Sequence, residues 1–371
     1  MGKEVIDSAV PKLLPAYYYC EDTVFQQERE RILKDAWQFV ARADQLASPG
    51  DFVTTRLNEI PVLIVRDKDK AKAFVNVCPH RGAEIILKEE GKAQVLMCHY
   101  HGWTWKLDGT LFRAPSTKDD AMFHPSCFGL QELPLEQLGP FYFTSVGCPM
   151  PWSKLLGELP DILKERACDL SKLKYVGKQS YDMNCNWKIV VENFLECYHC
   201  PISHPSFCDV INLRDYTVTP YRYFSTQKGP AKQEVELPHE NARYGIYNFL
   251  WPFFMVNIYP GKDNASTNII RPLSPTRTLV TYEFFVHPEM EAKQTEEIVG
   301  LIHQVQLEDV TICESVQRGL ASGRYPGGRL VMSKENGIRH FQSLVNEFLG
   351  SPSSLPNTRS ERALQSHVGV C

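Results

Sequence analysis

Two short segments place cysteine beside histidine, in a pattern suited to binding iron. The first reads Cys-Pro-His at residues 78–80, the second reads Cys-His-Tyr-His at residues 98–101, and 17 residues separate them. Each is followed by a glycine, where a tight turn would bring the backbone close to a metal. Two thiolates and two imidazoles can hold a [2Fe–2S] cluster with a different ligand pair on each iron. The expected cluster ligands are Cys78, His80, Cys98 and His101.

A zinc site of the Cys2His2 type is the alternative for these four residues. Zinc fingers and knuckles usually place their cysteines together and their histidines together, whereas each segment here carries one of each. The interleaved order therefore favours a cluster whose two irons have different ligands. The segments CPHRGAEI and CHYHGWTWKLDGTL resemble the Rieske iron–sulfur domain, at the spacing usual for that family.

A second group of metal-binding residue types lies near residue 200. A helix is predicted over residues 184–199, with an apolar stripe on one side and Glu192, Glu196 and His199 on the other. His204 follows after a proline that must break the helix, so two imidazoles can approach one ion from adjacent directions. The alternative is that these histidines are ordinary core or surface residues.

A carboxylate far along the chain completes this group. A long amphipathic helix is predicted over residues 292–321, and Asp309 falls inside its apolar stripe, with Glu308 at the stripe's edge. Because a buried carboxylate needs a cation, an iron held by His199, His204 and Asp309 is expected. Two histidines and one carboxylate with open positions are typical of non-haem Fe(II) oxygenases. The alternative partner is an arginine, for which the candidates are Arg271, Arg318 and Arg324.

Cys197 and Cys200 flank His199 in a Cys-x-x-Cys pattern that is also found in zinc sites. Thiolate ligands would block the open positions that oxygen chemistry needs. On a helix, Cys197 also points about 100° away from Glu196. Both cysteines are therefore expected to be packing residues.

Composition limits the class of protein. The chain has 371 residues, of which 43% are apolar and 23% charged, as in ordinary soluble proteins of about two domains. A net charge of −4 and a pI near 6.3 give no electrostatic reason to bind nucleic acid or an anionic membrane. Apolar runs are too short for a membrane-spanning helix, and the start lacks an export signal. Twelve cysteines spread over this length favour a reducing cytoplasm.

The order of predicted elements indicates an α+β protein. Residues 1–37 are expected to form an N-terminal helical segment, with a helix over 22–37, that packs on the catalytic domain. Residues 38–150 form an all-β domain that carries both Cys/His segments. Residues 151–350 form a catalytic domain that begins with a helical stretch over 150–173 and has an antiparallel sheet flanked by helices, of the helix-grip type. Residues 351–371 are expected to be a flexible tail.

The segments NWKIVVENFLECYHCPISHPSF and LEDVTICESVQRGLASGRY resemble the catalytic domain of Rieske non-haem iron oxygenases. With the cluster segments, the resemblance spans roughly residues 20–348. It implies one [2Fe–2S] cluster on the four residues above and one Fe(II) on His199, His204 and Asp309. It also implies that Glu196 bridges His199 to the cluster ligand His101 of a neighbouring subunit in a homotrimer.

The resemblance also implies the remaining partners. O2 is the co-substrate, and electrons come from NAD(P)H through a separate reductase, with or without a ferredoxin, because the chain carries no flavin or nicotinamide motif. Asn193 is a further candidate near the iron.

The substrate is expected to be a small molecule. ECYHC and ESVQRGL resemble the family branch of carnitine, choline and glycine betaine monooxygenases, which implies monooxygenation of a quaternary ammonium or amine compound, with C–N cleavage or N-demethylation. Aromatic faces can hold such a cation or stack on an aromatic ring. The candidate pocket residues are Tyr247, Phe249, Trp251, Phe253, Phe254 and Asn257.

Two alternatives to this function stay open. One is the alpha subunit of an aromatic-ring hydroxylating dioxygenase. The other is a Rieske electron-transfer protein without a working mononuclear iron. Iron content distinguishes the electron-transfer protein from an oxygenase, because an oxygenase holds about three irons per chain and an electron carrier holds two.

Overall fold

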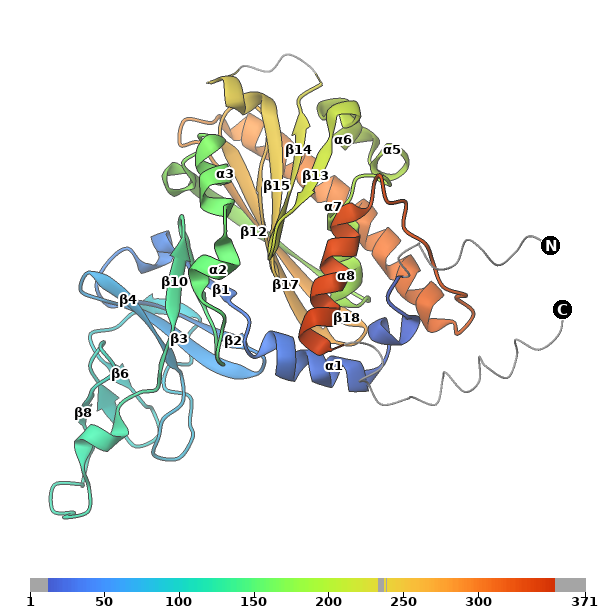
Figure 1. Cartoon of the computed structure of the whole chain (residues 1–371). Coiled ribbons are helices and arrows are strands. Elements are labelled where there is room, and N and C mark those ends of the chain that lie inside the picture. Colours follow the sequence, from blue (N-terminus) through green and yellow to red (C-terminus); the bar gives the residue numbers. More distant parts are fainter. Residues whose placement is uncertain (1–12, 233–236, 238, 351–371) are drawn as a thin grey trace, which may run out of the picture.

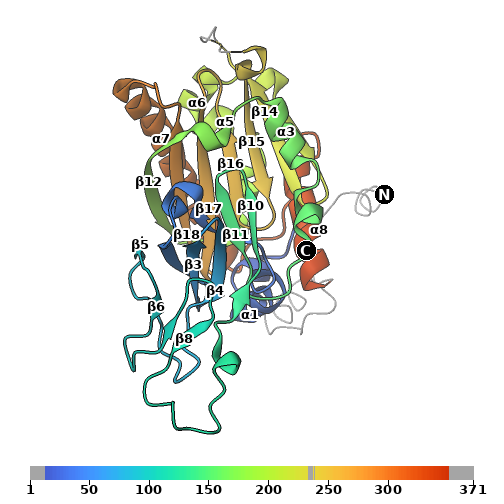
Figure 2. The same ribbon diagram turned by 90° about the vertical axis from the view of Figure 1, so that its left-hand side faces the viewer.

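The computed structural model describes residues 13–232, 237 and 239–350 and arranges them as two sheet-based parts (Figure 1). Residues 1–12 and the predicted tail, 351–371, lie outside the described residues. Figure 2 shows the larger part standing above the smaller one. Within the described residues, no helix combines the length and apolar character needed to cross a bilayer.

The smaller part consists of short antiparallel strands, as the frequent Gly, Pro, Asn and Asp residues predict. A five-stranded sheet has the order β5-β2-β3-β4-β9, and a three-stranded sheet has the order β6-β7-β8. The strand β6 is only two residues long, because the second Cys/His loop starts directly after it. The strands are β2 (Asp51–Leu57), β3 (Ile60–Asp67), β4 (Lys70–Val75), β5 (Glu90–Lys92), β6 (Leu96–Met97), β7 (Thr104–Trp105), β8 (Leu111–Arg113) and β9 (Glu132–Leu133).

A second three-stranded sheet joins this part to the larger one. Its rings Phe39, Phe141 and Phe143 pack on Phe254 of the large sheet, with centroids 5.8, 5.5 and 4.9 Å apart. Phe254 is thus a core residue on the sheet face opposite the helices. The strands, in the order β1-β11-β10, are β1 (Gln38–Arg42), β10 (Leu135–Leu138) and β11 (Phe141–Thr144).

The larger part is built on a seven-stranded antiparallel sheet with the order β12-β18-β17-β16-β15-β14-β13. Helices flank it, so the predicted α+β class and the flanked antiparallel sheet are confirmed. The strands are β12 (Lys174–Met183), β13 (Thr217–Pro220), β14 (Phe224–Pro230), β15 (Tyr244–Leu250), β16 (Phe254–Ile258), β17 (Asn264–Ser274) and β18 (Arg277–Val286).

Three helices cover one face of this sheet: α4 (Trp187–Phe194), α7 (Ala292–Ala321) and α8 (Asn336–Leu349). α7 matches the predicted range of 292–321 at both ends. The other α-helices are α1 (Asp22–Glu28), α2 (Trp152–Leu156), α3 (Leu159–Glu165), α5 (Cys200–Ser203) and α6 (Pro205–Val210). The short helical turns are η1 (Ala16–Tyr19), η2 (Arg29–Leu33), η3 (Ala43–Leu46), η4 (Pro125–Phe128), η5 (Leu170–Lys172), η6 (Leu213–Asp215) and η7 (Glu240–Arg243).

Three predicted helices differ from the structure. The helix expected over 184–199 ends at Phe194, and the chain then loops to α5. The helix expected over 22–37 ends at Leu33, where η2, a single π turn, finishes α1. The helical stretch over 150–173 breaks at Gly157, which has a φ of +47° and separates α2 from α3.

The described part of the N-terminal segment packs on α4. Lys188 of α4 and Glu28 of α1 form an ion pair that is fully buried. Trp187 Nε1 donates a hydrogen bond to the other oxygen of Glu28, at 2.8 Å. The start of the chain therefore fixes the helix that leads into the loop near residue 200.

Candidate functional site

The two Cys/His segments form matching loops. In the first, Cys78 N–H donates to Ala83 O at 2.8 Å, and Gly82 N–H donates to Cys78 O at 2.9 Å. The second loop repeats both bonds around Cys98, at 2.8 and 3.0 Å. The glycines have φ of +76° and +69°, a conformation that a side chain would strain. The glycines predicted from the sequence thus close both turns.

These loops bury the sulfur atoms and expose the imidazoles. Cys78 and Cys98 are 3% and 1% exposed, and their thiols lie side by side. His80 and His101 are exposed, with ring centroids 4.6 Å apart. Burial raises the pKa of the Cys78 thiol, while backbone N–H groups act in the opposite direction. Two inner thiolates and two outer imidazoles fit a cluster whose irons differ in ligands.

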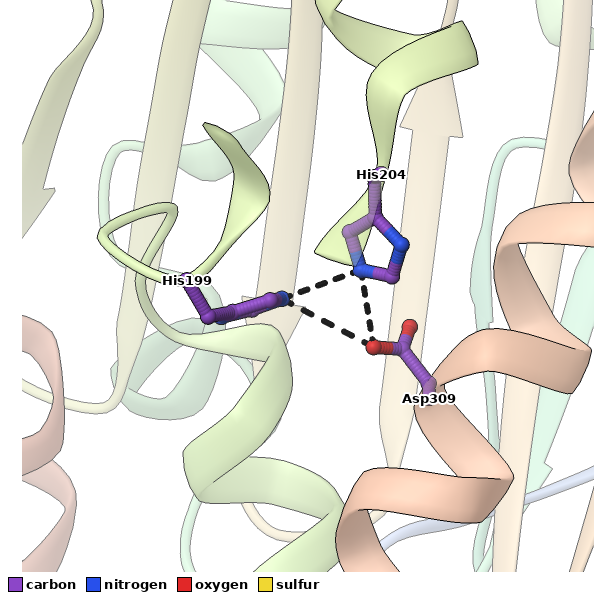
Figure 3. Close-up of side chains that lie close together, drawn as sticks. All are labelled: His199, His204 and Asp309. Carbon is purple, nitrogen blue, oxygen red and sulfur yellow. Dashed lines mark hydrogen bonds and ion pairs between the residues drawn. The ribbon is translucent and has the colours of Figure 1, made fainter. Parts of the chain in front are cut away.

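His199, His204 and Asp309 point toward one another, from the loop after α4, the α5–α6 junction and α7 (Figure 3). His204 Nε2 lies 3.0 Å from His199 Nε2 and 2.9 Å from Asp309 Oδ1, and the third distance is 3.6 Å. Atoms bound at right angles about 2.1 Å from one ion lie about 3.0 Å apart. The three side chains therefore fit a single metal ion held from one side.

Each histidine has a carboxylate beside its other ring nitrogen. Glu196 Oε1 lies 2.5 Å from His199 Nδ1, and Glu308 Oε2 lies 2.8 Å from His204 Nδ1. Burial acts to lower the pKa of His204, but its bonds to Asp309 and Glu308 outweigh burial and raise that pKa. Carboxylates in these positions favour a proton on Nδ1, which leaves Nε2 free to bind a metal.

Glu192 does not join this group, contrary to the helical face predicted for it. Because α4 ends at Phe194, Glu192 stays on the helix and faces the N-terminal segment. Its Oε1 accepts hydrogen bonds from Tyr19 Oη at 2.7 Å and Gln342 Nε2 at 2.9 Å. Burial raises the pKa of Glu192 to about 7.

The charged partners of Asp309 in the described part of the chain are the two histidines, and none of the three candidate arginines pairs with it. Arg318 pairs with Glu314, and Arg271 donates a hydrogen bond to a threonine of β2. Asn193 Nδ2 donates to Asp309 Oδ1 at 2.7 Å. The structure thus places Asn193 beside the group, as the sequence predicts.

Cys197 and Cys200 are joined by a disulfide, with their Cα atoms 5.0 Å apart. The prediction that they only pack is therefore wrong, because the tight turn after α4 brings the two sulfurs together. His199 lies within the short loop that this disulfide closes. Because both sulfurs are in the disulfide, neither cysteine offers a thiolate to a metal.

A cavity of about 670 Å³ opens beside the three converging side chains. Tyr247 and Asn257, two of the predicted pocket residues, lie in its wall, and α7 supplies apolar side chains such as Leu301. Tyr216 and Tyr259, which the sequence did not single out, extend the aromatic wall, with ring centroids 6.3 and 5.8 Å from Tyr247.

Gly245 makes room for this wall. A Cβ atom at Gly245 would lie 2.6 Å from the hydroxyl oxygen of Tyr247, so a larger residue would displace the ring. A glycine two residues before a tyrosine in a strand is a weak signal of such close packing, and no sequence signal brings Tyr216 and Tyr259 to the same place.

Three other aromatic residues predicted in the pocket are core residues instead. Phe249 shares a sheet face with Tyr247, but α4 and α8 cover that half of the sheet, and Phe249 packs on α8 at 5.9 Å between ring centroids. Trp251 and Phe253 pack on Trp187 of α4, at 6.4 and 5.1 Å. The helices cover this half with their own aromatic rings, and the wall of the cavity does not include these three residues.

Comparison with known families gives two matches along the chain. Residues 36–134 match the Rieske [2Fe-2S] domain. Residues 170–351 match the catalytic domain of the ring hydroxylating alpha subunit. The first match contains both Cys/His loops, and the second contains the three converging side chains.

Curated relatives cover most of the chain. The carnitine monooxygenase oxygenase subunit of Acinetobacter pittii (strain PHEA-2) is 33% identical over 348 residues, which is 89% of this chain and 93% of that protein. The chloroplastic choline monooxygenase of Arabidopsis thaliana is 31% identical over 353 residues, which is 90% of this chain and 82% of that protein.

Solved structures agree with these relatives. The quaternary ammonium Rieske monooxygenase CntA in complex with L-carnitine has a TM-score of 0.82 at 30% identity, covering 91% of this chain and 96% of that chain. Naphthalene 1,2-dioxygenase from Rhodococcus sp. has a TM-score of 0.75 at 20% identity, covering 90% and 94%, and shows the shared fold alone. The chain therefore belongs to the Rieske non-haem iron oxygenases, as an oxygenase alpha subunit that uses a [2Fe–2S] cluster, a mononuclear iron and O2.

Proposed function

We propose that this chain is the terminal oxygenase of a system that hydroxylates a carbon attached to nitrogen in a small quaternary ammonium or amine compound. Such a product collapses to an aldehyde and a freed amine. The cavity carries this proposal, because aromatic faces attract an alkylammonium cation. Burial raises the pKa of Tyr216, Tyr247 and Tyr259, so these rings stay neutral and their hydroxyls add no charge. The relatives named for carnitine and choline support the same substrate class.

Acidic side chains outnumber basic ones among the residues that line the cavity, which also favours a cationic substrate. Glu289, Glu291 and Glu297 line it, and Lys262 is the lysine among the lining residues. Lys262 Nζ donates to the backbone oxygen of Glu289 at 3.0 Å. Acidic side chains at an entrance raise the local concentration of a cation.

We assign the metal ligands from the geometry described above. An iron bound there would supply the chemistry of O2 activation, with electrons from the cluster. His199, His204 and Asp309 would hold the iron from one side and leave its other side open to the cavity. Asn193 holds Asp309 Oδ1 in place, and the tyrosine wall orients the substrate and limits access of water. The proposed cluster ligands are Cys78, His80, Cys98 and His101.

We also propose that electrons pass between subunits of a homotrimer. The cluster loops and the α5–α6 region lie at opposite ends of the folded molecule (Figure 1). Exposed apolar side chains flank both ends: Ile202 is 87% exposed beside the iron loop, and Leu87 is 66% exposed beside the cluster. A contact between subunits would bury such side chains, which is favourable. Head-to-tail packing would place Glu196, already bonded to His199, beside His101 of the neighbouring subunit.

A separate reductase, with or without a ferredoxin, would bring electrons from NAD(P)H in the cytoplasm. The exposed imidazoles of His80 and His101 give such a partner access to the cluster edge. Purified chain alone should therefore not oxidise NAD(P)H, and a surrogate reductase should be needed for turnover.

Oxygen uptake with defined substrates tests the proposed function. The iron-loaded protein and a surrogate reductase are supplied with choline, carnitine, glycine betaine and simple aromatic hydrocarbons. We expect O2 consumption coupled to aldehyde release with a quaternary ammonium compound. Dihydrodiol formation from an aromatic compound would instead establish the dioxygenase alternative. Two irons per chain and no turnover would establish the electron carrier.

A further inference from the structure

His204 is held at both ring nitrogens by two consecutive residues of α7. Its Nε2 lies 2.9 Å from Asp309 Oδ1, and its Nδ1 lies 2.8 Å from Glu308 Oε2. The imidazole is buried, whereas the Glu308 side chain is 24% exposed. The helix α7 therefore provides one proposed iron ligand, Asp309, and through Glu308 it also contacts a second proposed ligand, His204, at the ring nitrogen that faces away from the iron.

Glu308 is itself fixed in position. Gln304, one turn earlier on α7, donates from Nε2 to Glu308 Oε1 at 2.9 Å. One carboxylate oxygen is thus used by Gln304 and the other by His204.

The contact between Glu308 and His204 bears on which ring nitrogen of His204 carries the proton. An imidazole that binds a metal through Nε2 must carry its proton on Nδ1. A carboxylate beside Nδ1 accepts that proton's hydrogen bond, fixes the orientation of the ring and raises the basicity of Nε2. Glu196 stands in the same relation to His199, but it comes from the loop between α4 and α5, which also carries the exposed side chain of Tyr198.

We propose that Glu308 is a positioning residue for the mononuclear iron, acting through His204. This proposal rests on the proposed iron site at His199, His204 and Asp309. The two histidines then have separate supports: Glu196 lies in the loop that we propose contacts the neighbouring subunit, and Glu308 lies on α7 of the same subunit. Iron affinity depends on Glu308 even in a preparation that receives no electrons.

Titration of Fe(II) into the protein, depleted of mononuclear iron but retaining its cluster, tests this proposal. Glu308→Ala removes the carboxylate, and Glu308→Gln keeps the size of the side chain and a hydrogen-bond acceptor but removes the charge. Glu296→Gln, an exposed residue on the same helix, is the matched control. We expect the Fe(II) dissociation constant to rise about 10- to 100-fold in Glu308→Ala and less in Glu308→Gln. The control should match the wild type.

Two further readouts separate positioning from a structural effect. The electron paramagnetic resonance spectrum of the Fe(II)–nitric oxide adduct should change in Glu308→Gln, and the melting temperature of the iron-depleted protein should not. If Glu308→Ala fails to fold, Glu308→Gln decides the question. Wild-type affinity and an unchanged spectrum in Glu308→Gln would overturn the proposal while leaving the proposed function intact. Absence of Fe(II) binding by the wild type would instead overturn the proposed function.

Discussion

Glu192 and Glu196 lie four residues apart, yet they belong to two separate polar networks. Glu192 is bonded to Tyr19 and Gln342 and lies close to the buried pair of Lys188 and Glu28. Glu196 is bonded to His199, beside a cavity and an exposed loop. The end of α4 at Phe194 separates the two networks.

The difference shows how one segment combines stability with chemistry. In the closed network, the polar atoms find partners within the fold, which holds α4 against the N-terminal segment. In the open network, Nε2 of each histidine and Oδ1 of Asp309 converge on a shared point, which suits a metal ion. Substitutions in the closed network should therefore change stability, and those in the open network should change metal binding and turnover.

The largest effect is expected for Asp309→Ala in the open network. Removal of one of three ligands should release the mononuclear iron and abolish hydroxylation, because the two histidines alone bind iron weakly. Iron analysis should fall from about three to two per chain, while the visible spectrum of the cluster persists. Turnover that survives this substitution would contradict the iron assignment.

Lys188→Met should have the largest effect in the closed network. It leaves the carboxylate of Glu28 buried without its cation, which typically costs about 3–5 kcal/mol. Urea unfolding followed by tryptophan fluorescence should report this loss. Lys293→Met, at an exposed ion pair of α7, is the control and should change stability by less than about 1 kcal/mol. Equal effects of the two substitutions would show that the network around Lys188 is not closed to water.

Glu196→Gln should separate electron transfer from iron binding. The substitution keeps the size of the side chain but removes the charge beside His199 Nδ1, so turnover should fall about 10- to 100-fold. The cluster should remain, and so should the iron when Fe(II) is in excess, because Cys78, His204 and Asp309 are untouched. The measurement is the rate of cluster reoxidation after rapid mixing with O2 and substrate. A rate equal to that of the wild type would remove Glu196 from the proposed electron path.

Glu192→Gln should change the way in which the stability of the protein depends on pH. The pKa of Glu192 is about 7 in the folded chain, well above that of an exposed carboxyl group. Between about pH 4.5 and 7 the unfolded chain loses this proton before the folded chain does, so the wild type loses stability as pH rises. Glu192→Gln cannot ionise, and should become more stable than the wild type by an amount of the order of 3 kcal/mol at pH 8. A stability difference that does not change between pH 5 and 8 would contradict the raised pKa.

Local sequence was sufficient for the cluster loops. The expected ligands occur within two short segments, and the glycine after each one adopts the positive φ that the turn requires. The long amphipathic pattern also predicted α7, including the position of Asp309 within it. These features depend on residues close together in the chain, so their spacing carries most of the information.

Features that depend on the packing of distant elements could not be predicted in this way. Strand alternation places Tyr247 and Phe249 on one face, but it does not show that α4 and α8 cover only the second of them. The contact of Glu308 with His204 was also missed, although two adjacent carboxylates on α7, with Gln304 one turn earlier, are a usable signal. The helix end at Phe194 depends on the turn that the following residues form, including the Cys197–Cys200 bond.

Mixing two inactive variants is the most direct test of electron transfer from the cluster of one subunit to the iron of the next. Cys78→Ser should lack the cluster and keep the iron, and Asp309→Ala should lack the iron and keep the cluster. Assembled together as a head-to-tail trimer, about one site in four pairs an intact cluster with an intact iron of the next subunit, so about a quarter of wild-type activity should return. Assemblies that contain both variants and remain inactive would contradict transfer between subunits.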